Sequence, residues 1–306
     1  KSYTYKEFSD RVNKLAGALK AQGIKKGDKV GFLVPNIPEM LEGHFAPLKI
    51  GGILVAINTR LSGREISYIL NHSESKVLVF DSEFGDIIEK IKPELTNIDC
   101  FVQIIDTEPE NKNIDSIEYE KFLETSPDGD HFVDLDSEED HVTINYTSGT
   151  TGLPKGVQYS SRGAYISALG NVMESSMSST TNYLWTLPMF HCNGWTYPWA
   201  VTAAGGTHVC LRQVRADEIF RLISEEEITN MCCAPTVLTA MYTSKHAEGQ
   251  DLSKVTVMTA GAPPAPIVIR SIEEMGAEII HGYGLTETYG PMTVCAYQPS
   301  WESMET

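Results

Sequence analysis

The first part of the chain alternates between two hydrophobic periods, one typical of helices and one typical of strands. Thr4 and Glu7 form a capping box before a segment whose apolar residues recur at helical spacing, and Gly23 closes that segment. Ser62 and Glu65 form the same pattern before a second amphipathic segment. The apolar runs around these segments predict a helix at 38–50 and strands at 29–34, 53–58 and 76–81.

The alternation resumes after a polar interval. Residues 106–140 are rich in Asp, Glu and Asn, and they predict a surface excursion with one short helix near 117–123. Beyond it we expect helices at 161–177, 195–204, 217–226 and from Pro235, and strands at 141–146, 183–187, 207–211, 228–233, 255–259 and 277–280. Helices that alternate with strands are typical of mostly parallel sheets covered on both faces. The expected fold class is therefore α/β, with mostly parallel sheets flanked by helices in two layered subdomains of about 1–140 and 141–306.

The predicted strand at 141–146 runs into a segment that cannot continue it. Residues 146–157 read YTSGTTGLPKGV, with three glycines, one proline and four hydroxyl side chains. Glycines let backbone N–H groups turn toward one point, and Lys155 adds a positive charge, so the segment predicts a concave site for phosphate oxygens. It is not a Walker-type P-loop, because Pro154 precedes Lys155 and Gly156 follows it. A surface loop without a ligand is the alternative, but it gives no reason for Pro-Lys-Gly directly after an apolar strand.

Three further polar or glycine-bearing segments come after predicted strands, at 188–195, 261–263 and 282–288. Ligands of open α/β sheets bind beyond the carboxyl ends of the strands. We therefore expect these segments and 147–156 to contribute to one site.

Composition narrows the class of protein. The 306 residues suggest about two domains, and the formal charge of −17 excludes a general nucleic-acid binder, which needs clustered Lys and Arg. The six cysteines contain no Cys-x-x-Cys pair and indicate free thiols in a reducing compartment. We find no signal peptide and no apolar run of membrane-spanning length, so we expect no transmembrane segment and a cytoplasmic location. The chain begins with Lys1 rather than Met, which leaves an N-terminal targeting segment open.

Three motifs carry a resemblance to a known family. Residues 146–157 resemble the phosphate-binding signature of the adenylate-forming superfamily, which includes acyl-CoA synthetases, firefly-type luciferases and the adenylation domains of peptide synthetases. HGYGLTET at 281–288 and PMFHCNGW at 188–195 resemble two further motifs of that family, in family order. The wording FHCNGW is most similar to short- and medium-chain acyl-CoA synthetases, including methylthiopropionate-type ligases.

For the phosphates and the metal ion, the resemblance implies roles for Thr286, for Glu287 with Thr147, and for the loop. Thr286 contacts the α-phosphate of ATP, and Glu287 binds Mg²⁺, an ion that favours oxygen ligands and bridges to substrate phosphates. Thr147 completes the metal shell. A helix N-terminal charge is the alternative for Glu287. The loop binds the β- and γ-phosphates through Thr147, Ser148, Gly149, Thr150, Thr151, Gly152 and Lys155.

For the adenine base, the resemblance implies a slot with two walls. One wall is the ring of Tyr283, and Gly282 and Gly284 beside it let the backbone approach closely. A packed core position is the alternative for Tyr283. The other wall consists of Gly261, Ala262 and Pro263.

The acyl group is implied to contact His191, Gly194, Trp195 and Gly284. His191 lines the carboxylate end of the acyl pocket and shifts between the two half-reactions, so it joins Thr286 and Glu287 as a catalytic candidate, although we do not assign it as a general base. Trp195 matches a tryptophan that gates the acyl tunnel in some fatty acyl-CoA synthetases. The alternative for Trp195 is a packed aromatic side chain.

The sequence departs from the family pattern in two places. Ser161-Arg162 stands where relatives often carry His-Arg. After Thr288 we find no Thr-Gly-Asp motif, whose aspartate binds ribose, no hinge, and no C-terminal domain with the lysine that assists adenylation. We therefore expect 1–306 to be an incomplete N-terminal AMP-binding domain without its C-terminal lid, and we do not expect Lys155 to replace that lysine.

The resemblance implies an AMP-forming acyl-CoA synthetase, an acid–thiol ligase. It would activate a short- or medium-chain carboxylic acid with ATP and Mg²⁺ to acyl-AMP and then transfer the acyl group to CoA; a homodimer is one option for its assembly. Without its lid, the chain should turn over poorly. The alternatives are another adenylate-forming enzyme, either luciferase-like or amino-acid-activating, and a non-catalytic module that binds nucleotide or acyl-adenylate. An amino-acid activator should carry an aspartate for the substrate amine, and the motif wording does not favour one.

Overall fold

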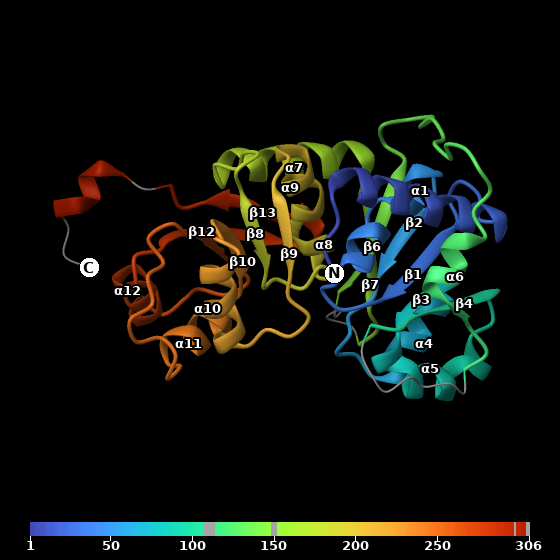
Figure 1. The fold of residues 1–306 in the computed structure, drawn as a ribbon, viewed down its shortest axis with the longest axis horizontal. Helices are drawn as coiled ribbons and strands as arrows, with labels where there is room; N and C mark the ends of the chain where they lie inside the picture. The colour runs from blue at the N-terminus through green and yellow to red at the C-terminus, as the bar shows by residue number, and fades with distance from the viewer. Residues whose placement is uncertain (107–113, 148–151, 297, 304–306) are drawn as a thin grey trace. The chain divides into compact units, whose positions relative to one another are not determined.

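Figure 1 shows the computed structural model of this chain, which describes residues 1–106, 114–147, 152–296 and 298–303. By their contacts the residues divide into two compact units. The first unit consists of Lys1–Ile166 and Pro188–Gly194, and the second of Ser167–Leu187 and Trp195–Thr306. Each unit is built around its own sheet.

The sheet of the first unit has seven strands in the order β5-β4-β3-β1-β2-β6-β7. Its pairs are parallel except for β6 with β7, which run antiparallel. The central strands β1 and β3 are almost wholly buried and have continuous apolar runs in their interior, as expected for a sheet covered on both faces. The strands are β1 Lys29–Leu33, β2 Ile53–Ala56, β3 Ser75–Asp81, β4 Cys100–Ile104, β5 Ile117–Glu118, β6 His141–Thr147 and β7 Lys155–Ser160.

Helices cover both faces of this sheet, with α4 and α5 on one side and α1 on the other in Figure 1. Both predicted capping boxes are present: the Thr4 hydroxyl accepts from the Glu7 N–H at the start of α1, and Glu65 accepts from the Ser62 N–H at the start of α4. Their apolar stripes then face the sheet. The elements are α1 Tyr5–Ala21, α2 Pro38–Gly43, α3 Ala46–Lys49, α4 Gly63–His72, α5 Gly85–Ile91, α6 Tyr119–Glu124, and the 3₁₀ turns η1 Ser82–Phe84 and η2 Lys92–Glu94.

The first unit differs from the sequence prediction in three ways. The helix expected at 38–50 is two short helices, because Pro47 lacks an N–H and is accommodated only in the first turn of α3. The sequence reading missed α5, β4 and β7. The strand β6, which we expected to open the second subdomain, pairs with β2 through Val55 opposite Ile144, so this unit extends past residue 140.

The second unit has a six-stranded sheet in the order β13-β12-β11-β10-β8-β9, parallel except for β12 with β13. Its core lies between α10, α11 and α12 and the central strands, with Phe220, Leu238 and Ile272 packed against Met231 and Val257. Its strands are β8 Asn182–Trp185, β9 Thr207–Cys210, β10 Asn230–Cys233, β11 Thr256–Thr259, β12 Glu278–Leu285 and β13 Gly290–Val294. Its helices are α9 Tyr197–Ala204, α10 Ala216–Glu225, α11 Pro235–Tyr242 and α12 Pro266–Glu274, with η3 Thr286–Thr288 and η4 Pro299–Ser303. Two helices cross the division of the units, α7 Ser161–Glu174 and the single turn α8 Cys192–Trp195.

The strand β12 is longer than predicted. We expected it to end at residue 280, but it continues through Gly282-Tyr283-Gly284 to Leu285. The physical reason is a partner that local periodicity does not reveal, since β13 pairs antiparallel with this half of β12. Tyr283 therefore lies on a strand rather than in a loop.

The predicted fold class is confirmed, because both sheets are mostly parallel and flanked by helices. Within the described part of the chain, no helix combines the length and the apolar character that crossing a membrane requires. All six cysteines are free, and four of them are buried.

Candidate functional site

The predicted phosphate loop is described only at its two ends, which lie side by side in the first unit. Thr147, the last residue of β6, is opposite Lys155, the first residue of β7. Lys155 is exposed, and its amine makes no hydrogen bond or ion pair among the described residues. Gly152 has a φ of 99°, a left-handed conformation that only glycine adopts without strain. The rest of the loop lies outside the described residues, namely Ser148, Gly149, Thr150 and Thr151.

Helix α4 braces both ends of this loop. The Tyr68 hydroxyl donates to the Pro154 carbonyl at 3.3 Å, and His72 Nδ1 lies 2.8 Å from the Tyr146 hydroxyl. The Tyr68 and His72 rings stack with centroids 5.2 Å apart. Burial raises the pKa of Tyr146 to about 12, so its hydroxyl stays protonated at neutral pH. These contacts fix where the loop leaves β6 and where it enters β7.

In the second unit, two of the predicted nucleotide-binding segments lie at the same edge of the sheet. The adjacent strands β11 and β12 are parallel, with Thr259 opposite His281. Gly261, Ala262 and Pro263 follow β11, while Gly282 and Tyr283 follow His281. A Cβ at Gly282 would lie 3.8 Å from the Ala260 Cβ, which shows how closely the two segments approach. The Tyr283 side chain is 65% exposed, so a flat ligand could reach its ring.

A short 3₁₀ turn after β12 carries the two polar residues expected at the phosphates. Thr286 is buried, whereas Glu287 is exposed and makes no hydrogen bond or ion pair among the described residues. Thr288 fixes the turn, because its hydroxyl accepts from the Leu285 N–H at 2.8 Å and donates to the Gly290 carbonyl. At the end of β11, the buried Thr259 hydroxyl has no hydrogen-bond partner among the described residues. Burying a hydroxyl without a hydrogen-bond partner costs free energy. A polar ligand bound at this edge of the sheet would supply that partner.

Besides the approach to the adenine base that the resemblance implies, Gly284 has a structural role in the pairing of β12 with β13. A Cβ at Gly284 would lie 1.7 Å from the Gly290 carbonyl oxygen, and a Cβ at Gly290 would lie 2.9 Å from the Trp195 Cβ. Both glycines are therefore required by the close approach of β13 to β12 and of Trp195 to β13. Trp195 itself is only 5% exposed.

His191 belongs to the first unit and precedes a tight turn. Its N–H donates to the Pro188 carbonyl, and its Nδ1 lies 3.5 Å from Cys192 Sγ. The residue is exposed, yet the protein around the ring removes enough water to lower the pKa of the imidazole, and the charge of Arg60 lowers it further. The ring is therefore neutral at neutral pH, and can accept or donate one hydrogen bond.

The turn after His191 is left-handed throughout. Five consecutive residues from Cys192 to Thr196 have positive φ angles of 48°, 43°, 52°, 55° and 66°. Only Gly194 adopts this conformation freely, and each L-residue costs roughly 1–2 kcal/mol in it. The turn contains two predicted acyl-binding residues, Gly194 and Trp195, and the division between the units falls between them.

Residues that the sequence reading did not assign hold this turn. In the first unit, the Asn193 side chain is buried among Thr143, Asn145 and His44. In the second unit, the Asn171 amide donates to the Trp195 carbonyl at 2.7 Å and to the Thr196 hydroxyl at 2.9 Å. One signal could have found two of them, since Thr143 and Asn145 are polar residues that alternate with the apolar Val142 and Ile144 in the middle of a predicted strand.

No group of three or more His, Cys, Asp or Glu side chains among the described residues is placed to hold a metal ion. A cation at Glu287 would therefore take further oxygen ligands from bound phosphate or water, which is how Mg²⁺ is usually held. The free carboxylate of Glu287 fits that role.

The fold is α/β, and the segments after β11 and in β12 at one edge of the second sheet are candidates for binding a nucleotide. The family model for "AMP-binding enzyme" matches residues 1–306, so the chain belongs to the family of AMP-binding enzymes. The resemblance inferred from the three motifs is thereby confirmed.

Solved structures agree with the family. An anthranilate–CoA ligase in complex with anthranoyl-AMP superposes with a TM-score of 0.87 at 26% identity, over 96% of this chain and 57% of that chain. The inhibitor-bound N-terminal domain of FACL13 from Mycobacterium tuberculosis superposes with a TM-score of 0.85 at 28% identity, over 95% of this chain and 71% of that chain.

Similar proteins of known sequence are CoA ligases. An acetate/butyrate–CoA ligase of Arabidopsis thaliana, named as peroxisomal, is 40% identical over 99% of this chain and 56% of its own length. A 4-hydroxybutyrate–CoA ligase of Metallosphaera sedula is 38% identical over 99% of this chain and 56% of its own length. The chain thus spans about half the length of the curated relatives it matches.

Proposed function

We propose that this chain is the AMP-binding part of an ATP-dependent, AMP-forming acyl-CoA ligase. The observation that carries the proposal is the shared sheet edge at Thr259 and His281, where an exposed tyrosine, an open glycine turn and a buried unpartnered hydroxyl meet in a family of AMP-binding enzymes. A substrate carboxylate oxygen attacks the α-phosphorus of ATP, and pyrophosphate leaves. The sulfur of CoA then attacks the acyl carbon, its thiol proton is lost, and AMP leaves.

In this proposal the chain acts mainly by positioning and electrostatics. The loop residues 147–152 and Lys155 bind the β- and γ-phosphates, and Thr286 donates to the α-phosphate. Lys155 suits the role because its amine is exposed and has no carboxylate partner among the described residues. Glu287 and Thr147 would hold Mg²⁺, which would neutralise charge on the phosphates.

The adenine base lies against Tyr283, with Gly261, Ala262 and Pro263 as the opposite wall and Gly282 beneath it. The acyl group contacts His191, Gly194, Trp195 and Gly284. A neutral His191 imidazole can donate one hydrogen bond to an acyl or carboxylate oxygen without adding charge. Relatives named for acetate, butyrate and 4-hydroxybutyrate support a short-chain substrate.

Three further points belong to the proposal. We propose that residues 1–306 form part of an N-terminal AMP-binding domain, which the coverage of about half of each relative supports. We propose a homodimer as the assembly. We keep a cytoplasmic location as the proposal, although several relatives are named as peroxisomal.

The test is calorimetric titration of the chain with non-hydrolysable acyl-adenylate analogues that differ only in the acyl group. We expect affinity to peak at a short acyl group, and Trp195→Ala to move the peak toward longer groups by about tenfold in relative affinity, the scale of one or two buried methylenes. Glu287→Gln should weaken Mg²⁺-dependent binding of ATP while leaving the acyl preference unchanged.

Two results would contradict the proposal. A folded chain that binds neither AMP nor any acyl-adenylate analogue would refute the nucleotide site. A preference for an aminoacyl-adenylate would instead favour an amino-acid-activating enzyme.

A further inference from the structure

Four buried polar side chains of the first unit converge on the left-handed turn. His44, Thr143, Asn145 and Asn193 are each at most 2% exposed. They come from the end of α2, from β6 and from the turn, and His44 lies 149 residues before Asn193 in the sequence. A buried polar group is costly unless it is hydrogen-bonded, so such a cluster is stable only when its donors and acceptors match.

The donors and acceptors of this cluster do match. The Thr143 hydroxyl and the Asn145 amide both donate to Asn193 Oδ1, and the Asn193 N–H donates to Asn145 Oδ1 at 3.0 Å. The Asn145 amide also donates to the Thr143 hydroxyl at 3.2 Å. Asn145 thereby binds both the main chain and the side chain of Asn193.

His44 completes the cluster through its neutral form. Its Nδ1 lies 2.8 Å from the Met40 carbonyl, which can only accept, so in the neutral ring Nδ1 carries the proton. Nε2 then accepts from the Asn193 amide at 3.3 Å. Both ends of the Asn193 side chain are therefore held, the oxygen by β6 and the nitrogen by His44.

This arrangement explains how the chain maintains an unfavourable backbone. Asn is one of the few residues that tolerates positive φ, and Asn193 lies in the middle of the turn that follows His191 and leads into Trp195. Trp195 itself has a positive φ in this turn, so the conformation of the turn sets the direction in which the Trp195 side chain leaves the main chain. Thr147 lies two residues beyond Asn145 on β6, so the same strand carries the clamp and a proposed phosphate residue.

We propose that Thr143, Asn145 and His44 are positioning residues that act through Asn193: they clamp the left-handed turn and thereby set the selectivity for the acyl group. The proposal rests on the proposed acyl-adenylate function of the chain. None of the three contacts the acyl group in this scheme; each acts through the conformation of the turn.

The clamp is tested with Thr143→Val, which keeps the shape of the side chain and removes the hydroxyl, and with Thr143→Ser as the matched control that keeps the hydroxyl. Asn145→Asp is a second variant, which keeps the acceptor for the Asn193 N–H but replaces the amide donor by an oxygen. Two quantities are measured on the 306-residue chain. One is amide hydrogen exchange at Asn193 without ligand, and the other is the ratio of affinities for butyryl and octanoyl sulfamoyl-adenosine, with AMP as the reference ligand.

We expect Thr143→Val and Asn145→Asp to speed exchange at Asn193 by about tenfold, as for the loss of one buried hydrogen bond. The butyryl-to-octanoyl ratio should fall by about threefold or more, while AMP affinity stays within about twofold, because the nucleotide contacts do not involve the turn. Thr143→Ser should resemble the wild type in both measurements. A global loss of stability would instead speed exchange across the whole first unit.

The outcomes separate the two proposals. Unchanged exchange at Asn193, or faster exchange with an unchanged ratio of affinities, would overturn the clamp while the proposed function stands. If the wild-type chain binds neither AMP nor the analogues, the proposed function fails, and the clamp fails with it as a determinant of selectivity.

Discussion

His44 is a titratable side chain with no exposed surface. Burial lowers its pKa to about 4, although the Met40 and Met189 backbones favour the charged ring. In the unfolded chain the pKa of a histidine is about 6.5. Between these two values the unfolded state binds a proton that the folded state does not, so acid favours unfolding in this window.

We predict that acid lowers the free energy of unfolding through the titration of His44. The contribution of His44 is fully present above pH ~6.5 and falls by about 3 kcal/mol as the pH drops toward 4. His44→Gln removes the titration while keeping a side chain that can hydrogen-bond. We expect the difference in unfolding free energy between wild type and His44→Gln, measured with urea, to shrink steadily from pH 7 to pH 4.5. A difference that is independent of pH would show that the folded ring is protonated as easily as the unfolded one.

At the scale of elements, the backbones of β12 and β13 approach so closely that they restrict which residues the hairpin accepts. A Cβ at Gly284 would overlap the Gly290 carbonyl oxygen at 1.7 Å, whereas a Cβ at Gly282 would meet the Pro291 Cβ at an ordinary 3.5 Å. Both glycines lie on the same strand and neither has a positive φ. Replacing each of them by alanine therefore separates the effect of steric crowding from the general effect of replacing a glycine in a strand.

We predict that Gly284→Ala destabilises the chain by at least about 1–3 kcal/mol, the usual range for overpacking, because β13 must move away from β12. Gly282→Ala should change the unfolding free energy by less than about 1 kcal/mol. Chemical denaturation of both variants measures the difference. Equal effects would mean that the hairpin adjusts without cost, and that the close approach of Gly290 to β12 is not a constraint.

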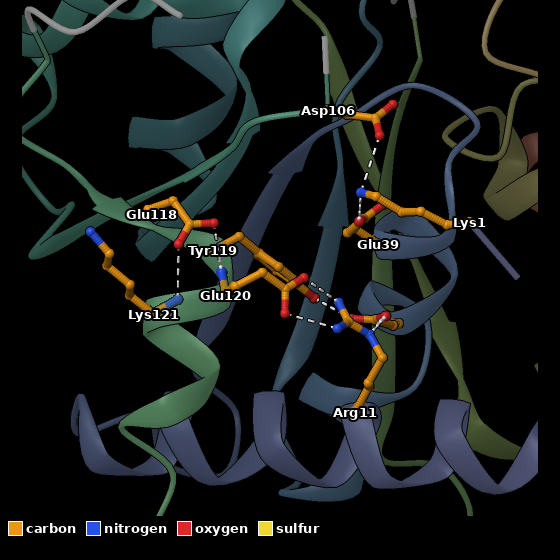
Figure 2. A network of polar contacts seen from close by, with 9 residues as sticks. Lys1, Arg11, Glu39, Asp106, Glu118, Tyr119, Glu120 and Lys121 are labelled. Atoms are coloured by element: carbon orange, nitrogen blue, oxygen red, sulfur yellow. Dashed lines mark hydrogen bonds and ion pairs between the residues drawn. The ribbon is translucent and has the colours of Figure 1, made fainter. Parts of the chain in front are cut away.

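At the scale of the whole molecule, one arginine joins segments of the first unit that are far apart in sequence. Arg11 on α1 contacts Glu42 on α2 at 2.6 Å, and the Tyr119 hydroxyl donates to the same Glu42. Arg11 also contacts Glu120 on α6 at 2.8 Å (Figure 2). Glu42 has no exposed side-chain area. Burial raises the pKa of Glu42, and the contact with Arg11 opposes that rise.

Arg11→Met should destabilise the chain by about 3–5 kcal/mol, because it leaves a buried carboxylate without its cation. The control is Arg221→Met on α10, an exposed residue whose ion pairs with Glu218 and Glu225 are screened by water and should contribute little to stability. The deficit of Arg11→Met should be larger at pH 8 than at pH 5. Arg11 lowers the pKa of Glu42, so its removal raises that pKa further in the variant, and a carboxyl with a raised folded pKa loses stability as the pH rises through that value. Similar effects of the two substitutions in denaturant titrations would contradict this view of the network.

The sequence alone determined those features of the fold and of the motifs whose signal is local. The capping boxes at Thr4 and Ser62, the alternation of helix and strand, and the position of three of the four polar segments after β6, β8 and β11 all depend on residues a few positions apart. The three motifs also indicated the family, because spacing of glycines, hydroxyls and charges is preserved in the linear chain. The assignments of residues 148–151, of Glu287 and of the acyl contacts stay predictions.

Tertiary structure decided what depends on partners distant in the sequence. The strand β7 and the second half of β12 form because antiparallel neighbours supply their hydrogen bonds, and hydrophobic periodicity does not encode a partner. For the same reason Gly284 is fixed by the Gly290 carbonyl, and Asn193 by His44 and Asn145. The left-handed turn has no local signal beyond Gly194, since its cost is offset by hydrogen bonds from β6 and from α7 that exist only once the chain has folded.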